Sequence, residues 1–243
     1  MSPVLTLDVD WAPDFMIDFV AEHLTRRRVK ATWFITHGSP AIDRLRAHQD
    51  IFELGIHPNF AADSTQGGFP EEVLRHCLAL VPGARCMRTH GLIQSTQLLG
   101  RVATTTPIRL DCSLYLPRTP NLRPVPYHFG SVELLRIPYC WEDGFEMLHP
   151  RPWWDLREVL GLDGGLKVLN FHPVHLYLNL TAFSRYEDLK RRLDLRHCTP
   201  GEVAGWASPA TGPRTMFLDV LQHLEHTGGS RTLGEVGGQG GRP

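Results

Sequence analysis

Short apolar runs that end in a polar, metal-capable or titratable side chain recur along this chain. The first is segment 5–10, in which Asp8 and Asp10 stand one residue apart. Five later runs end in the same way, at His57, His90, Asp111, Asp143 and His172. Reactive residues just past the ends of successive strands are typical of a barrel that carries its chemistry on one rim.

The segments between these side chains alternate between strand and helix patterns. Short β-prone apolar runs predict strands over 5–10, 31–36, 51–56, 85–88, 108–110, 133–137 and 166–171. Apolar residues at helical spacing predict helices over 13–28, 42–48, 71–80, 95–102, 153–160, 186–193 and 215–226. The proline-rich stretch 117–126 is too irregular to assign. Seven strands alternating with helices predict an α/β fold of parallel units closing into a barrel-like sheet.

Length and composition indicate one globular domain. The chain has 243 residues, 42% of them hydrophobic and 21% charged, which suits a single catalytic domain over 1–227. The segment 228–243 is rich in glycine and is expected to be disordered. The formal net charge of −1 gives no electrostatic reason to bind nucleic acid or an anionic membrane.

The cysteines and the first residues bear on location. Five widely spaced cysteines without a Cys-x-x-Cys pair argue against a disulfide framework and for a reducing compartment. We see no signal-peptide pattern before the first expected strand, and no run approaches the ~18 apolar residues of a spanning helix. These features predict a cytoplasmic protein without a membrane span.

Asp8 and Asp10 are the first candidates for chemistry. If both lie in a strand they point to the same side, because side chains alternate with period two. One carboxylate could then bind a metal while the other acts as a base; alternatively, both are solvated acids or a helix cap. His57 follows an apolar run and is a reasonable ligand for zinc or a similar ion, or it is structural.

Further candidates follow two later strands. Arg88 could pair with a catalytic carboxylate and lower its pKa, or it could be a surface residue of a loop. His172 and His175 lie three residues apart after the last expected strand. One of them could be a general acid, both could be ligands, or both could be loop residues.

Taken in order, these motifs resemble the polysaccharide deacetylase superfamily, the NodB-homology fold of carbohydrate esterase family 4. Thr6-Leu-Asp-Val-Asp10, Lys30-Ala-Thr-Trp-Phe-Ile35 and Glu53-Leu-Gly-Ile-His57 resemble its first motif, second strand and metal motif. Further matches are Arg88, Asp111-Cys-Ser113, the aromatic Trp141 and the closing His172. The resemblance spans about residues 3–180, and segments 8–11 and 171–179 look most like the WbmS-like branch.

The resemblance implies a distorted (β/α)7 TIM-like barrel and a role for each matching residue. Asp8 would be the general base, Asp10 and His57 metal ligands, and Arg88 the residue that orients Asp8. His172 would protonate the leaving amine. The implied cofactor is a divalent metal, zinc by preference, with cobalt or another ion as alternatives.

One metal ligand departs from the family pattern. The second metal-binding histidine of the family falls at Ala61 in this chain. Asn59, Asp63 and His90 are the candidates to replace it. Asp111, Trp141 and His175 are further candidates for a ligand or a substrate contact.

These observations leave two functional hypotheses. The first is a metal-dependent hydrolase that removes an N-acyl group, acetyl or formyl, from an amino sugar or related small metabolite, in surface-polysaccharide biosynthesis; a non-sugar C–N bond is a sub-case. The second, motivated by Ala61, is a catalytically inert barrel that binds carbohydrate or a protein partner.

Overall fold

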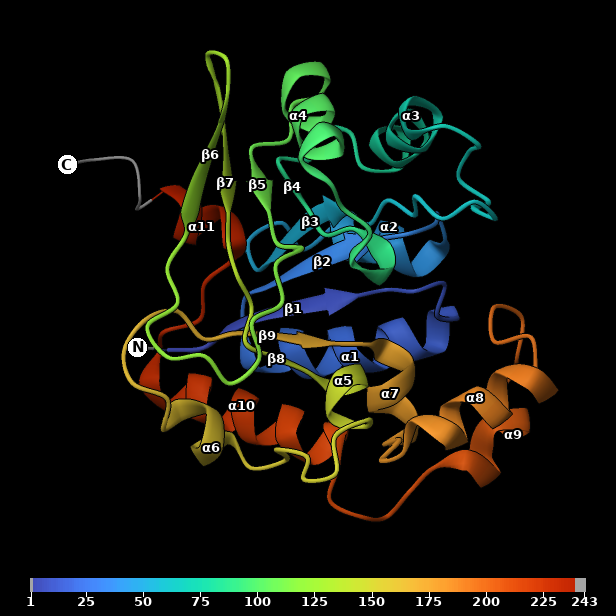
Figure 1. The fold of residues 1–243 in the computed structure, drawn as a ribbon. Helices are drawn as coiled ribbons and strands as arrows, with labels where there is room; N and C mark the ends of the chain where they lie inside the picture. The colour runs from blue at the N-terminus through green and yellow to red at the C-terminus, as the bar shows by residue number, and fades with distance from the viewer. Residues whose placement is uncertain (1, 239–243) are drawn as a thin grey trace.

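The computed structural model describes residues 2–238 and contains one nine-stranded sheet, ordered β6-β7-β5-β4-β3-β2-β1-β9-β8 (Figure 1). The strands are β1 (Val4–Asp8), β2 (Ala31–Ile35), β3 (Phe52–Ile56), β4 (Cys86–Met87), β5 (Leu110–Asp111), β6 (Val125–Phe129), β7 (Val132–Arg136), β8 (Trp141–Glu142) and β9 (Val168–Phe171). All neighbours pair in parallel except β6 and β7, which form an antiparallel hairpin. The sheet curls as a barrel does, and between residues 2 and 238 no ladder joins its edge strands β6 and β8. The α/β class and the barrel-like arrangement are therefore confirmed.

Helices follow most strands and cover the sheet. The first group is α1 (Asp14–Arg27), α2 (Pro40–Arg46), α3 (Pro70–Leu80), α4 (Thr96–Thr105), α5 (Asp143–Glu146) and α6 (Leu156–Leu160). The second is α7 (Pro173–Leu178), α8 (Phe183–Arg192), α9 (Pro200–Val203), α10 (Pro213–Thr227) and α11 (Leu233–Gly238), with short 3-10 turns at His90–Leu92 and Ala204–Trp206. Helix α1 packs against α2, α7 and α10. No helix among residues 2–238 is both long and apolar enough to cross a membrane.

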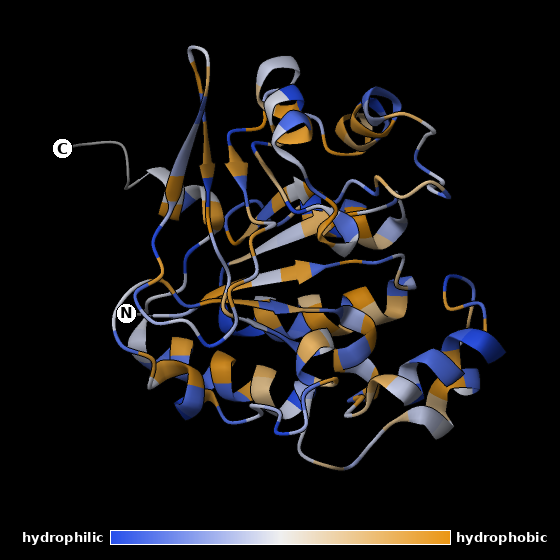
Figure 2. Cartoon of the chain, in the orientation of Figure 1, coloured by the Kyte–Doolittle hydropathy of each residue, from blue (hydrophilic) through white to orange (hydrophobic). Residues whose placement is uncertain are grey.

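The central strands are the core of the molecule. Every residue of β1, β2 and β9 is buried, as expected for parallel strands covered on both faces. Figure 2 shows these strands as largely hydrophobic, whereas α8 is largely hydrophilic. The rigid sheet holds the carboxyl ends of its strands in one place, and the polar side chains that follow them therefore converge.

Two strands lie where the sequence predicts none. Strand β6 begins at the last two residues of the proline-rich stretch and continues to Phe129. Pro126 is tolerated there because β6 is an edge strand, where a residue without an N–H need not break a ladder bond. Strand β8 has only two residues, Trp141 and Glu142, too few for a periodic pattern. The first strand ends at Asp8 instead of residue 10.

The glycine-rich segment after residue 227 is ordered as far as residue 238, contrary to the expectation of disorder. Helix α11 lies across the amino ends of β2 and β3, where the Leu233 N–H donates to Thr32 Oγ1 (2.9 Å) and the Gly234 N–H donates to Glu53 Oε2 (2.9 Å). Leu233 is fully buried in a cluster with Val4 and Phe34. Composition alone missed this helix because two apolar side chains, Leu233 and Val236, anchor it. Residues 239–243 of the expected tail lie outside the described residues.

We expect Leu233→Ala to lower the free energy of unfolding by about 2–5 kcal/mol, since it removes a fully buried leucine from a packed cluster. Urea denaturation would measure the change. The control is Val125→Ala on the exposed edge strand, which should cost less than about 0.5 kcal/mol. Equal stability of Leu233→Ala and the wild type would show that α11 does not contribute to the fold.

Candidate active site

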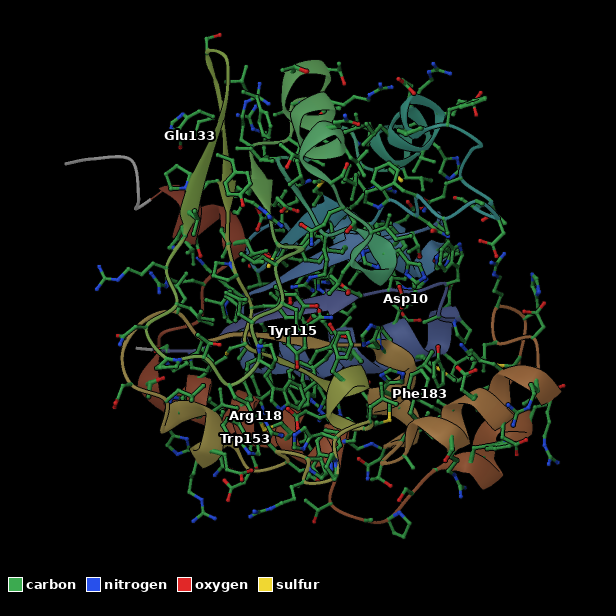
Figure 3. The ribbon with its side chains drawn as sticks, viewed as in Figure 1. Asp10, Tyr115, Arg118, Glu133, Trp153 and Phe183 are labelled. Atoms are coloured by element: carbon green, nitrogen blue, oxygen red, sulfur yellow. The ribbon has the colours of Figure 1, made fainter. Side chains whose placement is uncertain are left out.

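A cavity of about 290 Å³ lies at the carboxyl ends of the central strands. Polar side chains from β1, β3, β4, β8 and β9, or from the residues that follow them, reach it. Its polar lining is Asp8, Asp10, His57, Thr89, His90, Glu142, His172, His175, Tyr186 and Lys190, and its apolar lining includes Leu92, Phe145, Leu148 and Phe183. Figure 3 labels Asp10, which follows β1, and Phe183, which begins α8.

Asp10 reaches the cavity by a route that the sequence did not predict. Asp10 and Trp11 adopt left-handed backbone conformations (φ 46° and 55°) in a turn after β1. The Trp11 N–H donates to Thr36 Oγ1 (3.0 Å), which fixes this turn against the end of β2. The two aspartates therefore share the cavity because of a turn, and the period-two argument for them was wrong.

Three side chains bring electron-pair donors to one point. Asp10 Oδ1 lies 3.0 Å from both His57 Nε2 and His90 Nδ1, and the two ring nitrogens are 3.4 Å apart. His57 Nδ1 lies 2.7 Å from the Arg88 backbone oxygen, so its proton is donated there and Nε2 keeps a free electron pair. Ligands bonded to one tetrahedral ion at roughly 2.0–2.2 Å lie roughly 3.3–3.6 Å apart. The 3.4 Å separation lies in this range and the two 3.0 Å separations lie below it, so it is the set of two imidazole nitrogens and one carboxylate oxygen that suits a zinc-like divalent ion.

His90 stands where a third ligand is needed, and the other two candidates lie elsewhere. Its backbone N–H donates to the Pro58 oxygen (2.9 Å), and its ring packs edge-on against Trp11. Asn59 Oδ1 instead accepts from the Ala61 N–H (3.0 Å), and Asp63 is exposed; neither lines the cavity.

Charges within this cluster favour a negative Asp10. Burial alone would raise the pKa of Asp10, but the close approach of the His57 and His90 rings holds it well below its ordinary value. Burial also lowers the pKa of His90, and the hydrogen bond and charge of Asp10 outweigh this and raise it.

A buried guanidinium fixes Asp8. Arg88 is fully buried, and its Nη1 donates to Asp8 Oδ1 (2.9 Å) and also to Asn170 Oδ1. Asn170 Nδ2 donates to Asp8 Oδ2 (2.9 Å), so both oxygens of Asp8 are held. Arg88 therefore acts as the sequence suggested, and Asn170 is a partner that the sequence did not single out.

Aromatic rings enclose the same guanidinium. Its carbon lies 4.7 Å from the centroid of the Phe34 ring and 4.3 Å from that of Tyr139. Burial lowers the pKa of Arg88, but the charge of Asp8 raises it overall, so the residue keeps its proton.

His172 is oriented by a buried acid, Asp143. His172 Nδ1 lies 2.6 Å from Asp143 Oδ1, and its backbone N–H donates to Asp143 Oδ2 (2.8 Å). His172 Nε2 is thereby directed at the aspartates, 3.5 Å from Asp10 Oδ2 and 3.9 Å from Asp8 Oδ2. Burial lowers the pKa of His172, but Asp143 and then Asp10 raise it well above its ordinary value. The apolar run that ends at Asp143 was the only signal for this acid.

His175 also contacts Asp143, but its pKa is shifted in the opposite direction from that of His172. Its Nδ1 lies 3.0 Å from Asp143 Oδ1, and burial lowers its pKa, so the ring is neutral near pH 7. It lines the cavity, in agreement with its place among the candidates.

Two sequence candidates lie outside the cavity. Asp111 is buried against Arg136, whose Nε donates to Asp111 Oδ2 (2.7 Å), and Ser113 Oγ donates to Asp111 Oδ1 (2.6 Å). Trp141 is fully buried against Phe171, and its Nε1–H donates to the Trp153 oxygen (2.9 Å). Both have partners in the surrounding structure and neither lines the cavity, so this geometry gives no support to a metal or substrate contact, which stays a prediction.

Comparison with known proteins places this arrangement in context. A model of the WbmS-like family, described as polysaccharide deacetylase, matches residues 5–190. A structure from Bordetella bronchiseptica, described as a polysaccharide deacetylase involved in O-antigen biosynthesis, is similar at 32% identity and TM-score 0.76, over 90% of this chain and 89% of that one. A peptidoglycan N-acetylglucosamine deacetylase is similar in fold at 13% identity and TM-score 0.50, over 97% of this chain and 87% of that one. A search of curated proteins finds no match.

We expect Arg88→Ala to lower the free energy of unfolding by about 3–5 kcal/mol, because it leaves Asp8 buried without its cation. Chemical denaturation followed by fluorescence would measure the change. Arg101→Ala is the matched control: it breaks an exposed ion pair with Glu71 and should cost less than about 1 kcal/mol. Similar losses in both variants would contradict the central place given to Arg88.

Proposed function

The chain belongs to the WbmS-like family of polysaccharide deacetylases, and we propose that it is a metal-dependent hydrolase that removes an N-acyl group, acetyl or formyl, from an amino sugar. The observation that carries the proposal is the convergence of a ligand set with two further groups. Asp10, His57 and His90 meet beside the Asp8–Arg88 pair and the His172–Asp143 pair.

Asp10, His57 and His90 would hold the metal. A bound divalent ion, zinc by preference or cobalt, would polarise the acyl carbonyl and lower the pKa of a water molecule. His57 is prepared for this role because its Nδ1 is engaged with the Arg88 oxygen. Three protein ligands leave a position open, as catalytic zinc sites do.

Asp8 would act as the general base. Arg88 and Asn170 each donate to one oxygen of its carboxylate, so the group is fixed in orientation. Its Oδ2 lies 3.9 Å from His57 Nε2, close enough to reach a water at the ligand cluster without being one of its ligands. It would accept the water proton as the new C–O bond forms.

His172 would act as the general acid. Asp143 fixes the ring through Nδ1 and favours the protonated imidazole, which leaves Nε2–H facing the cavity. Transfer of this proton to the amide nitrogen lets the C–N bond break with a neutral amine as leaving group. Asp143 thus prepares His172 as the proton donor, while Arg88 holds Asp8 in place as the proposed proton acceptor.

The size and lining of the cavity favour a small substrate. A volume of about 290 Å³ with an apolar wall of Leu92, Phe145, Leu148 and Phe183 suits one sugar ring or a related small metabolite. The described role of the Bordetella relative in O-antigen biosynthesis supports a part in surface-polysaccharide synthesis. All five cysteines are free thiols, which supports our proposal of a cytoplasmic enzyme acting on a precursor.

Metal binding separates this proposal from the inert-barrel alternative. We expect His90→Ala to raise the Kd for zinc, because it removes one of three ligands. The increase should be at least roughly 10–100-fold, which is the effect of substituting a residue that only hydrogen-bonds to a ligand. Asn59→Ala is the control and should bind zinc as the wild type does, since Asn59 lies outside the cluster. Titration of apo-protein with a chromophoric zinc indicator would measure both. A wild-type protein that binds no divalent metal at micromolar concentrations would favour the inert barrel.

Asp8→Asn tests the division of labour between the two aspartates. We expect turnover to fall about 100-fold or more, because the base is lost, while the zinc content stays near one per chain. The amide oxygen can still accept from Arg88, while the amide NH₂ replaces the oxygen that accepts from Asn170. Asp10→Asn should instead lose zinc. Acetate release and elemental analysis are the two measurements, and loss of zinc from Asp8→Asn would show that Asp8 is itself a ligand.

A further inference from the structure

Glu142 is a carboxylate in the wall of the cavity that the mechanism above does not use. It is the last residue of β8, next to Asp143, and it belongs neither to the Asp10–His57–His90 cluster nor to the Asp143–His172–His175 cluster. Burial raises the pKa of Glu142, and the charge of Asp8 adds to this effect while His172 opposes it. An acid kept in such a place, beside the reacting groups, needs a partner for each of its oxygens.

One oxygen of Glu142 has partners within the protein. The Tyr139 hydroxyl donates to Glu142 Oε2 (2.7 Å), and Asn170 Nδ2 approaches the same atom at 3.3 Å. The Tyr139 ring is itself held, because it stacks on Tyr115, labelled in Figure 3, with centroids 4.8 Å apart and covers the Arg88 guanidinium. Tyr115 in turn stacks on Phe145 at 4.6 Å. The carboxylate is therefore fixed before any ligand arrives.

The other oxygen faces the cavity. Glu142 Oε1 has no hydrogen-bond partner among residues 2–238, and a Cβ built on Gly144 would lie 3.3 Å from it. The same Cβ would lie 3.7 Å from the His175 ring and 3.9 Å from the His172 ring, so the missing side chain at Gly144 leaves open the space in front of Oε1, beside the proposed general acid. His175 Nε2, from another residue that lines the cavity, is buried and also has no hydrogen-bond partner among residues 2–238.

We propose that Glu142 is a specificity-determining residue whose Oε1 accepts a hydrogen bond from the substrate, from a hydroxyl or amino group next to the acylated nitrogen. This inference rests on the proposed deacetylase function and adds a substrate requirement to it: a donor on the side of the ring that faces His172. A carboxylate with both oxygens paired is more stable in this site than one with a single free oxygen, so the bound donor contributes affinity. A substrate without that donor loses the contact and leaves the carboxylate unsatisfied, which is a strong basis for discrimination.

The test uses zinc-loaded protein with N-acetylglucosamine and its 3-, 4- and 6-deoxy analogues as probes. Affinity is measured by NMR titration and turnover by acetate release. We expect the 3-deoxy analogue, which lacks the hydroxyl next to the acylated nitrogen, to bind wild-type protein roughly 10-fold or more weakly than the parent sugar, while the 4- and 6-deoxy analogues bind as the parent does. Equal affinity for the parent and all three analogues would overturn the inference, and this arm needs no variant protein.

Two variants probe the protein side of the contact. In Glu142→Gln the amide oxygen can keep Tyr139 and Asn170 as donors, while its NH₂ group replaces the acceptor at the cavity by a donor. Gly144→Ala leaves the carboxylate intact and places a methyl group in front of Oε1. Both should weaken binding of N-acetylglucosamine roughly 10-fold and add little further loss for the sensitive deoxy analogue, because the same contact is already gone. Glu133→Gln, on the exposed side of β7 and labelled in Figure 3, is the matched control and should change nothing.

The two proposals fail in different ways. Acetate release with unchanged binding and selectivity in both variants overturns the role of Glu142 and leaves the deacetylase proposal standing. If wild-type protein releases no acetate from any probe, the deacetylase proposal fails for these sugars and the binding arm decides alone. Wild-type affinity in Glu142→Gln then overturns the inference, as does the absence of binding by wild-type protein.

Discussion

The buried guanidinium of Arg88 is the interaction on which the site depends. An unpaired charge at this depth would be severely destabilising, so each of its donors must find an acceptor. Nε donates to the Cys112 oxygen (2.9 Å), Nη1 to Asp8 and Asn170, and Nη2 to Thr6 Oγ1 (2.9 Å). These partners come from β1, β9 and the segment after β5. One planar cation that follows β4 therefore ties together β1, β9 and the segment after β5 across the curled sheet.

Arg88 also connects the proposed general base, Asp8, with a proposed metal ligand, His57. Through its side chain it holds Asp8, and through its backbone oxygen it receives His57 Nδ1–H (2.7 Å). Asn170 extends this network from Asp8 to Glu142. The proposed base, one proposed ligand and the proposed substrate acceptor thus share one rigid set of hydrogen bonds, which leaves little freedom in their spacing.

Sequence patterns located the strand ends well because apolar runs with turn signals report on burial, which is a local property. They are less informative where a long-range partner decides a side chain's role. Asp111 accepts a hydrogen bond from Arg136 outside the cavity, and Trp141 packs against Phe171 in the core. The proline content concealed the edge strand β6. The glycine content concealed α11, because two buried apolar side chains, Leu233 and Val236, are enough to pack a segment that composition marks as disordered.

The sequence by itself determined the parallel β/α order, the rim on which the polar side chains gather, and the identity of Asp8, Asp10, His57, Arg88 and His172 as its members. Only the tertiary structure decided which side chains meet. His90 joins Asp10 and His57 because the left-handed turn at Asp10 and the short turn at His90 bring them within 3.0–3.4 Å. Asp143, Asn170 and Glu142 reach the site because β8 and β9 pair beside β1 in the folded sheet. The succession of strands and helices along the chain follows from local hydrophobic periodicity. Contacts between residues 80 or 160 positions apart exist only once the sheet has curled and its core has packed.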